Sequence, residues 1–478
     1  MRENWAGSGV DLHLDLHLEL PARGGRRRAL EEALRRAVRD GRLPHGTRLP
    51  SSRALAAELR LSRGTVSAAY DQLVAEGYLT TRPGSGTEIA ALPPQLPAAN
   101  LPATAPAAPA RAAASEPEAV PVHDLRPGQP DLSAFPARAW MRATRHVLDT
   151  MPAAVLGPCD PRGRIELRTA LAAYLARTRG VLTTPDLIVV TTGFVQAINL
   201  LAQVVEGPFA MEDPGHDFYR DVVRRAGREV VPLPVDELGA RTGALTPDVA
   251  AAVVTPAHQY PMGVPLHPSR RLALREWGGL VVEDDYDGEF RYDRQPVGAF
   301  QGTAPERVVY CGTTSESLGP GLRLGWMAVP PALIGPLTEA KRYADAHTEV
   351  LGQLVLARLI ETHAYDRHIR AARLRYRRRL ELLRARLPHA CLPGVAAGLR
   401  ALLLLPAGGP PEAEVLAACE RAGIALRPAS PLWHGEGRDG LLIGYAAPSE
   451  RAYPRALEAL AGTLARWEPR ARPARSTQ

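Results

Sequence analysis

The stretch that decides the fold reads Tyr-Cys-Gly-Thr-Thr-Ser-Glu-Ser-Leu-Gly-Pro-Gly-Leu-Arg-Leu-Gly-Trp and covers residues 310–326. Apolar segments on either side of its centre are predicted to be strands. Between them lies a polar run that contains Glu316, and then a Gly-Pro-Gly turn and Arg323. Loops at the ends of buried strands are where α/β domains bind their ligands, so this stretch is a candidate binding site.

The chain around this stretch has the pattern of an α/β domain. From Asp124 onward, short β-branched runs alternate with helical stretches, which predicts a largely parallel sheet. The candidate strands are residues 187–192, 209–211, 230–233, 252–254, 280–282 and 308–310. Polar clusters follow several of these strands, at the edge where ligands bind in such sheets.

Several of these polar clusters carry recognisable chemistry. Gly193 and Phe194 lie between a strand and a helix, where backbone amides can hold a phosphate. The segments 212–215, 255–263 and 283–287 end three further strands. The acidic run 283–287 has a metal site as its alternative, but no suitably spaced histidine accompanies it, so we predict no metal.

The first ninety residues have a different pattern. Helices are predicted over 26–39, from Ser51 or Ser52 to residue 59, and over 63–76 with Ser62 as N-cap. Residues 78–81 and 87–89 predict a hairpin with a glycine-rich tip at 82–86. Three helices and a hairpin make a winged helix-turn-helix.

This module is predicted to bind DNA through its third helix and its wing. The exposed N-terminus of that helix can enter a major groove, and the wing tip can reach the minor groove. The predicted contact residues are Arg53, Ser62, Arg63, Gly64, Thr65, Ser67, Arg82 and Gly84. Charge alone is weak support, because residues 1–90 hold 14 Arg against 11 Asp and Glu. The alternative is a winged helix used for protein contacts.

Composition excludes few classes of protein. The chain has 478 residues and a formal net charge of +7, which permits a nucleic-acid partner without requiring one. Its 4 cysteines are far apart and indicate neither a zinc site nor disulfides. His13 and His17 alternate with carboxylates, which favours a solvated strand face over a metal site. No signal-peptide pattern or membrane-length apolar run is present, so we expect a soluble, cytoplasmic protein.

The Ala- and Pro-rich residues 91–120 are predicted to be a semi-rigid spacer between two domains. On either side of it, the sequence resembles two known families. Segments such as Leu-Ser-Arg-Gly-Thr-Val (61–66) and Arg-Pro-Gly-Ser-Gly-Thr (82–87) resemble the GntR family of bacterial regulators. The later segments resemble fold-type I pyridoxal-phosphate aminotransferases, and the whole arrangement resembles the MocR subfamily of GntR regulators.

This resemblance implies three parts and a fold for each. Residues 11–90 would be the winged helix-turn-helix, 91–120 the linker, and 121–470 an aminotransferase-like α/β domain with a smaller C-terminal subdomain. It also implies a cofactor pocket, in which Asp284 would pair with the pyridine nitrogen, Tyr286 with the phenolic oxygen and Arg323 with the phosphate. The other implied pocket residues are Gly193, Phe194, His216, His258, Tyr260, Ser315 and Glu316.

Several positions depart from the pattern of the family. Phe194 stands where a serine is usual, His216 stands where an aromatic tyrosine is usual, and Glu316 stands where the Schiff-base lysine is expected. A carboxylate cannot form a Schiff base. Lys341, the only lysine in the sequence, lies well downstream in a helical segment where an exposed charge is expected. We therefore predict no enzyme activity, and pyridoxal phosphate bound non-covalently at most.

The resulting prediction is a transcriptional regulator that binds a double-stranded DNA operator as a homodimer. Its aminotransferase-like domain would sense a small ligand, either an amine or a vitamin B6 vitamer, or serve as a dimer scaffold. For Glu316, the alternatives are a site for a cationic amine and an ion pair with a nearby arginine. The competing class of function is a pyridoxal-phosphate aminotransferase fused to a DNA-binding module.

Overall fold

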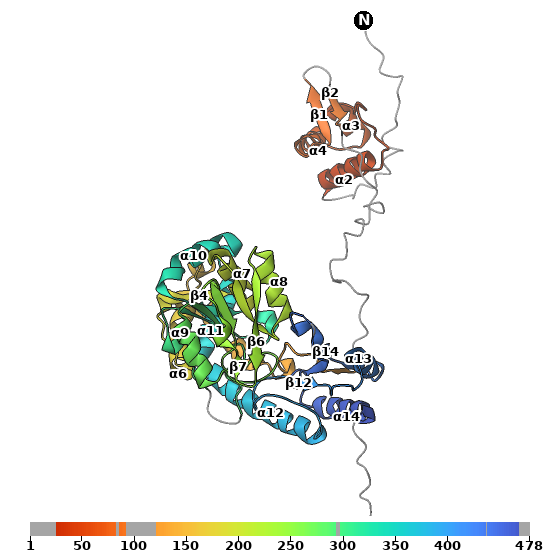
Figure 1. Cartoon of the computed structure of the whole chain (residues 1–478). Coiled ribbons are helices and arrows are strands. Elements are labelled where there is room, and N and C mark those ends of the chain that lie inside the picture. The colour runs from red at the N-terminus through yellow and green to blue at the C-terminus, as the bar shows by residue number, and fades with distance from the viewer. Residues whose placement is uncertain (1–24, 83–85, 92–120, 293–296, 436, 468–478) are drawn as a thin grey trace, which may run out of the picture. The chain divides into compact units, whose positions relative to one another are not determined.

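A computed structural model describes residues 25–82, 86–91, 121–292, 297–435 and 437–467 (Figure 1). The chain divides into two compact units, Met1–Glu118 and Ala119–Gln478. The segment with His13 and His17 lies outside the described residues, as does most of the predicted linker. The linker boundaries therefore stay a prediction.

The first unit is a winged helix-turn-helix. Its elements are α2 (Arg26–Arg39), α3 (Ser52–Glu58), α4 (Arg63–Ala75), β1 (Leu79–Arg82) and β2 (Gly86–Ile89). Ser51 and Ser62 cap α3 and α4 by accepting backbone N–H donors, and β1 and β2 pair antiparallel. Leu30, Leu55 and Val66 from the three helices are fully buried together. The predicted elements are confirmed to within one or two residues.

The second unit is built on an eight-stranded sheet in the order β4-β11-β10-β9-β8-β5-β6-β7. The strands are β4 (Ile188–Thr191), β5 (Phe209–Asp213), β6 (Val230–Asp236), β7 (Gly239–Ala240), β8 (Ala251–Val254), β9 (Leu280–Asp284), β10 (Val308–Thr313) and β11 (Gly325–Ala328). The pairs from β10 through β9, β8 and β5 to β6 are parallel, and β11 runs antiparallel to both of its neighbours. The predicted largely parallel sheet is confirmed.

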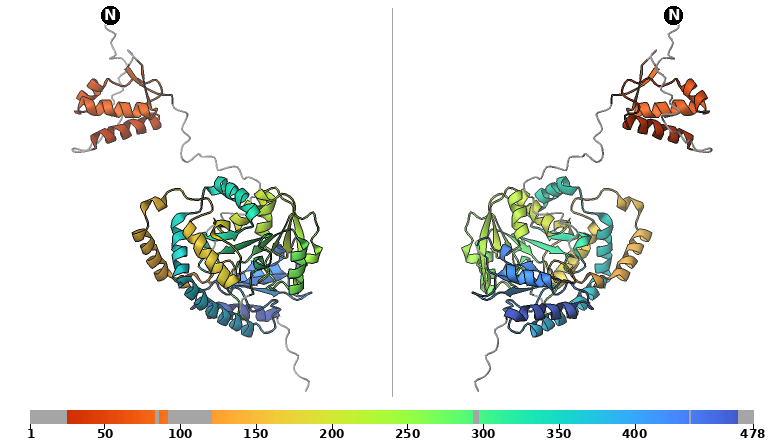
Figure 2. Two further views of the ribbon diagram at one scale, coloured as in Figure 1. Left: turned by 90° about the vertical axis from the view of Figure 1, so that its left-hand side faces the viewer. Right: turned by 90° about the vertical axis from the view of Figure 1, so that its right-hand side faces the viewer.

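Helices cover both faces of this sheet (Figure 2). One face packs against α7 (Phe194–Val204), α8 (Asp217–Arg225) and α10 (Pro331–Asp345). The other face packs against α6 (Ile165–Arg179), α9 (Pro268–Trp277) and α11 (Val350–Glu361). Because successive residues of a strand point to opposite faces, Val189 faces the first layer and Val190 the second.

A smaller C-terminal subdomain completes the unit. Its three-stranded sheet has the order β12-β15-β14. The elements are β12 (Ala401–Leu404), β14 (Arg427–Pro428), β15 (Gly440–Ile443), α13 (Glu412–Arg421) and α14 (Tyr453–Leu464). The long α12 (Ala364–Arg386) leads into it, and a short parallel pair of β3 (His123–Asp124) and β13 (Ile424–Ala425) ties it to the start of the unit. A further helix, α5 (Ala137–Thr150), packs on α11. Among the described residues, no helix is long and apolar enough to cross a membrane.

The stretch 310–326 forms the turn between β10 and β11. The Thr314 amide donates to the Leu324 carbonyl (2.9 Å), which closes the loop at its base. Arg323 has a left-handed backbone (φ 53°) that turns the chain into β11. Glu316 and Arg323 are thereby held at the end of the sheet where the polar clusters of β5, β8 and β9 also lie.

Candidate functional site

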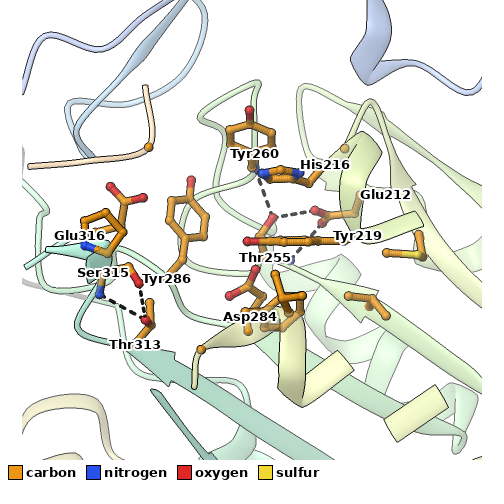
Figure 3. Close-up of a pocket in the computed structure, with 18 of the residues that line it drawn as sticks. Glu212, His216, Tyr219, Thr255, Tyr260, Asp284, Tyr286, Thr313, Ser315 and Glu316 are labelled. Atoms are coloured by element: carbon orange, nitrogen blue, oxygen red, sulfur yellow. Dashed lines mark hydrogen bonds between the residues drawn. The ribbon is translucent and has the colours of Figure 1, made fainter. Parts of the chain in front are cut away.

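A pocket of about 240 Å³ opens at the carboxyl ends of the parallel strands (Figure 3). Glu316 and Tyr286 lie on one side of it, His216 and Tyr219 lie on the other, and the carboxyl of Asp284 lies between the two sides. The lining residues include Gly193, Phe194, Glu212, His216, Tyr219, Thr255, Tyr260, Asp284, Tyr286, Ser315, Glu316, Arg323 and Arg400.

One part of the pocket has the features of an anion site. Gly193 precedes α7 with a positive φ of 119°, and no side chain caps this helix. A Cβ at position 193 would lie only 3.5 Å from both terminal nitrogens of Arg323. The free amides at the start of α7, its dipole and the guanidinium therefore converge on one place, which suits a phosphate or carboxylate.

The amide of Thr192, just before this turn, is held by a relay of side chains. Thr192 N–H donates to Gln196 Oε1 (2.9 Å), and Gln196 Nε2 donates to Asp345 Oδ2 (2.8 Å). Asp345 also accepts two bonds from Lys341 Nζ (2.6 and 2.7 Å). Lys341 is fully buried, so the expectation of an exposed charge is wrong. The ammonium group of this lysine is instead bound by Asp345 at the end of α10 and by Thr348 just beyond it (3.0 Å).

Asp284 and Tyr286 lie near the centre of the pocket. Burial, reinforced by the nearby Asp285 carboxylate, raises the pKa of Asp284 well above its usual range. The Tyr286 hydroxyl donates to the His258 carbonyl (3.1 Å), and burial raises the pKa of Tyr286. A positively charged or proton-donating ligand group beside Asp284 would therefore stabilise its ionised form.

Aromatic rings form one wall of the pocket. The His216 ring stacks on Tyr219, with 4.0 Å between centroids, and lies 5.1 Å from Tyr260. Burial lowers the pKa of His216 to about 4, so the imidazole is neutral near pH 7. The neutral imidazole and the two tyrosine rings together form a weakly polar wall against which a planar ligand can pack.

Glu316 forms a buried ion pair across the pocket. Arg400 Nη2 donates to Glu316 Oε1 (2.8 Å), and both side chains are at most 10% exposed. The Arg400 guanidinium also lies over the rings of Tyr260 and Tyr286, 5.0 and 4.8 Å from their centroids. Burial raises the pKa of Glu316 and Arg400 opposes that rise. Glu316 Oε2 and Arg400 Nε have no hydrogen-bond partner within the described part of the chain.

A third buried carboxyl, Glu212, lies beside the aromatic wall. Glu212 accepts from Thr255 Oγ1 (2.5 Å), from the Thr255 amide (3.2 Å) and from Gln259 Nε2 (3.1 Å). Burial raises the pKa of Glu212 to about 7. These bonds join the ends of β5 and β8 and fix the segment that carries Tyr260.

The pocket gathers nearly all of the predicted cofactor residues. Nine of the ten line it, whereas His258 lies behind Tyr286, where its Nδ1 contacts Asp287 (2.8 Å). Sequence reasoning missed Arg400 and Tyr219 as lining residues, and it placed Glu212 and Thr255 only within the polar segments 212–215 and 255–263. Tyr219 follows His216 at helical spacing and could have been found in that way. Arg400 belongs to no pattern in the sequence and comes from the other subdomain.

The predicted DNA-contact residues of the winged helix gather around α4. Arg53, Ser62, Arg63 and Gly64 are exposed, and Thr65 and Ser67 are half-buried. Ser62 Oγ accepts from the Thr65 amide (3.1 Å) and contacts the Thr65 hydroxyl (2.8 Å), so it serves first as a cap. Gly84 and the side chain of Arg82 lie outside the described residues. The residues that are described hold no cluster suited to a metal ion.

Comparisons with known proteins agree with both units. Residues 26–89 match the family described as bacterial regulatory proteins, gntR family, and residues 121–460 match aminotransferase class I and II. The pyridoxine biosynthesis transcriptional regulator PdxR of Corynebacterium glutamicum is 32% identical, covering 88% of this chain and 92% of that protein. The probable rhizopine catabolism regulatory protein MocR of Rhizobium meliloti is 33% identical over 88% and 90%. An archaeal alanine:glyoxylate aminotransferase superposes with a TM-score of 0.66 at 25% identity, covering 71% of this chain and 90% of that one.

A winged helix-turn-helix joined to an aminotransferase-like unit defines a class of DNA-binding transcription regulators. The chain belongs to the MocR subfamily of GntR-type regulators. Its two units are thus the DNA-binding module of that class and an aminotransferase class I and II domain.

Proposed function

We propose that this regulator senses a small, phosphorylated ligand in its aminotransferase-like unit without forming a covalent bond to it. The observation that carries the proposal is the pocket around Gly193, Asp284 and Arg323, which contains no lysine. Its proposed ligand class is a vitamin B6 vitamer or a related amine. Ligand binding would change the affinity of the winged helices for an operator by favouring one of two arrangements of the protein.

The residues present suit a phosphorylated pyridine ring that is held without a covalent bond. The amides at the start of α7 and Arg323 would hold the phosphate. Asp284 would pair with the ring nitrogen, the Tyr286 hydroxyl would face the phenolic oxygen, and the aromatic wall that contains His216 would pack against the ring. Bound pyridoxal phosphate supplies an aldehyde that reacts with amines, but this chemistry requires a lysine to anchor it.

Glu316 is proposed to stand where aminotransferases carry that lysine. Two observations support this assignment. Glu316 lies in the pocket on the β10–β11 turn, and Lys341, the only lysine in the sequence, is buried in α10 and bound to Asp345. The pairing with Arg400 also weakens the case for a cationic amine at Glu316 alone, because the carboxylate charge is already balanced. A ligand with both a phosphate and an amine, such as pyridoxamine phosphate, would place its phosphate at Arg323 and its amine near Glu316.

For the DNA-binding unit, Arg63 and Gly64 at the start of α4 are proposed to enter a major groove. The exposure of Arg53 and Arg63 supports this role. A homodimer is proposed because an operator with two half-sites would match two winged helices.

The ligand proposal is tested by thermal shift on the purified full-length protein with pyridoxamine phosphate, pyridoxal phosphate and unphosphorylated pyridoxamine. We expect stabilisation by both phosphorylated vitamers, little effect of pyridoxamine, and loss of the shift in Arg323→Ala. Arg358→Ala, on α11 and outside the pocket lining, is the control that should keep the shift. Stabilisation by pyridoxal phosphate alone would contradict the amine version.

The competing enzyme class gives a different result in the same samples. An aminotransferase would be yellow with pyridoxal phosphate, and borohydride would bleach it and leave a covalent adduct. We expect no adduct, since Lys341 is inaccessible. A stable adduct on the native protein, mapped to Lys341, would overturn the non-covalent proposal.

A further inference from the structure

Helix α12 concentrates the positive charge of the protein. Its 23 residues include nine arginines and two carboxylates, Asp366 and Glu381, for a net charge of +7. This equals the formal net charge of the entire 478-residue chain. The rest of the sequence is therefore neutral on balance, and the excess of cations resides in this one helix.

The arginines lie mainly on the side of α12 that faces away from the protein. The inner side is apolar and packs against the core of the unit, where the following residues are buried: Tyr365, Ile369, Tyr376, Leu380 and Leu383. The opposite side carries residues at helical spacing that form one stripe. The arginines of this stripe, which we call the outer arginine face, are Arg367, Arg370, Arg377, Arg378 and Arg384, and all five are exposed.

Several other arginines of α12 form bonds that stabilise the fold, whereas most of the outer arginines do not. Arg379 is buried against Asp131 (2.8 Å), and Arg373 donates to the Glu289 carbonyl (2.9 Å). On the outer face, Arg377 contacts Glu381 (3.0 Å). Within the described part of the chain, the remaining four outer arginines form no ion pair with a carboxylate. Their charges are available to a partner.

We propose that the outer arginine face of α12 is a second DNA-contact surface, which binds the phosphate backbone of a duplex. The span from Arg367 to Arg384 is about 25 Å at the rise of an α-helix. That length corresponds to the axial rise of about seven base pairs of a duplex. Arginine is also the side chain best suited to phosphate, because its guanidinium forms bidentate bonds and keeps its charge at every relevant pH.

A membrane surface is the other polyanion that a basic helix can bind. Helices that lie on membranes need a continuous apolar face that enters the lipid. The apolar face of α12 is already buried in the protein core, and the exposed side offers only Leu374 and Leu382 among its charges. DNA needs no such face, and the same chain carries a gntR-family DNA-binding module. A duplex held by that module would be at high local concentration for α12.

Figure 1 shows α12 as a long helix along the margin of the aminotransferase-like unit. Its length and its position at the margin leave the outer side free of other elements of that unit. The surface therefore needs no rearrangement of the unit to meet a straight duplex segment.

The test uses the full-length protein and two probes, a duplex from the promoter next to its own gene and a duplex of mixed sequence. The variant combines Arg367→Gln, Arg370→Gln, Arg378→Gln and Arg384→Gln. A control removes the same charge from exposed arginines of other elements through Arg225→Gln, Arg275→Gln, Arg421→Gln and Arg455→Gln. Affinity is measured by fluorescence anisotropy over a range of salt concentrations, and circular dichroism checks that each variant is folded.

We expect the α12 variant to bind both duplexes about tenfold or more weakly, and the salt slope to fall by about 3 to 4, as for the loss of four phosphate contacts. The matching Arg→Lys variant should restore most of the affinity. In contrast, Arg63→Ala should lose most of its affinity for the promoter duplex while keeping most of its affinity for the mixed sequence. This contrast separates the α12 surface from the winged helix.

Equal losses in the α12 variant and the control variant would overturn the proposal, because the effect would then be one of net charge. Retained affinity of the α12 variant for both duplexes would also overturn it, and lost co-sedimentation of that variant with phosphatidylserine vesicles would then assign the face to a membrane surface. If the quadruple variant does not fold, the pair Arg370→Gln and Arg378→Gln gives the same comparison, with a slope change of about 2.

Discussion

At the scale of single residues, Arg400 decides how Glu316 is to be understood. From the sequence alone, Glu316 could be either a site for a cationic amine or one half of an ion pair with a nearby arginine. In the structure, Arg400 forms that ion pair, and its guanidinium also lies over the rings of Tyr260 and Tyr286. A buried pair of this kind adds little to the free energy of unfolding. Removing one partner nevertheless destabilises the protein, because the other charge is left buried without a counter-charge. Glu316 and Arg400 should therefore behave as a unit.

A double-mutant cycle tests this coupling. Glu316→Gln and Arg400→Met should each lower the free energy of unfolding of the aminotransferase-like unit by about 3 kcal/mol, because each leaves an unpaired buried charge. The double variant should lose no more than either single one. Urea unfolding followed by tryptophan fluorescence gives the three values.

The exposed pair Arg377–Glu381 is the matched control, since its 3.0 Å contact is nearly as short but both side chains are more than half exposed. Its cycle should give a coupling below about 1 kcal/mol. Additive losses at Glu316 and Arg400, or a cost of Glu316→Gln as small as that of the exposed pair, would refute the coupled unit.

The sequence could predict most of the residues that line this pocket, but not the one that the C-terminal subdomain contributes. Asp284, Tyr286 and Arg323 each follow a predicted strand, and the carboxyl ends of parallel strands must meet at one edge. Arg400 was unpredictable for a physical reason. It comes from the C-terminal subdomain, and its approach to Glu316 depends on how that subdomain packs, which no local pattern encodes.

At the scale of elements, α10 positions the start of α7. The relay from Lys341 through Asp345 and Gln196 to the Thr192 amide links the two helices to the turn at Gly193. A lysine that is fully buried is costly unless it is paired, so this one is retained inside the fold by Asp345. The same turn is where the pocket gathers its anion-binding groups.

Lys341→Met should therefore act on the turn as well as on stability. We expect a loss of about 2 kcal/mol in the free energy of unfolding, because Asp345 loses its buried partner. The Thr192 amide should also exchange with solvent measurably faster, which hydrogen exchange followed by mass spectrometry detects.

The neighbouring Arg342→Met is the control, since Arg342 and Glu339 are 3.7 Å apart and both mostly exposed. It should change stability by no more than about 0.5 kcal/mol and leave the exchange of Thr192 unchanged. Unaltered exchange in Lys341→Met would mean that the relay does not hold the turn.

The prediction of elements succeeded where local signals are strong. Ser51 and Ser62 mark two helix starts because their hydroxyls cap the amides that follow, and β-branched runs mark the buried strands. The burial of Lys341 could not be inferred from α10, because its partner Asp345 sits at an ordinary i,i+4 spacing that is usually exposed.

At the scale of the whole molecule, exposed apolar side chains predict where two copies of the chain would meet. Met141 and Leu148 on α5 are 64% and 57% exposed and lie seven residues apart, on one face of the helix. Leu132 and Leu156, just before and after α5, are also exposed. Apolar surface gathered in this way is characteristic of association sites. We predict a homodimer that buries this region.

The prediction is tested by light scattering during size-exclusion chromatography. The native chain should have twice its monomer mass of 51.5 kDa. Met141→Glu combined with Leu148→Glu should shift it to the monomer mass, because two buried carboxylates in each copy would face an apolar partner. A monomer presents a single winged helix, so its affinity for an operator with two half-sites should fall about 100-fold or more, the factor by which linked modules exceed single ones.

Phe218→Glu combined with Leu272→Glu supplies the control, since these side chains are similarly exposed but lie on α8 and α9. This variant should keep the dimer mass and the operator affinity. A dimer that survives the α5 changes and dissociates with the α8 and α9 changes would place the contact elsewhere. A native chain that elutes as a monomer and still binds the operator tightly would contradict the predicted homodimer. Two separate molecules would then have to bind the paired half-sites.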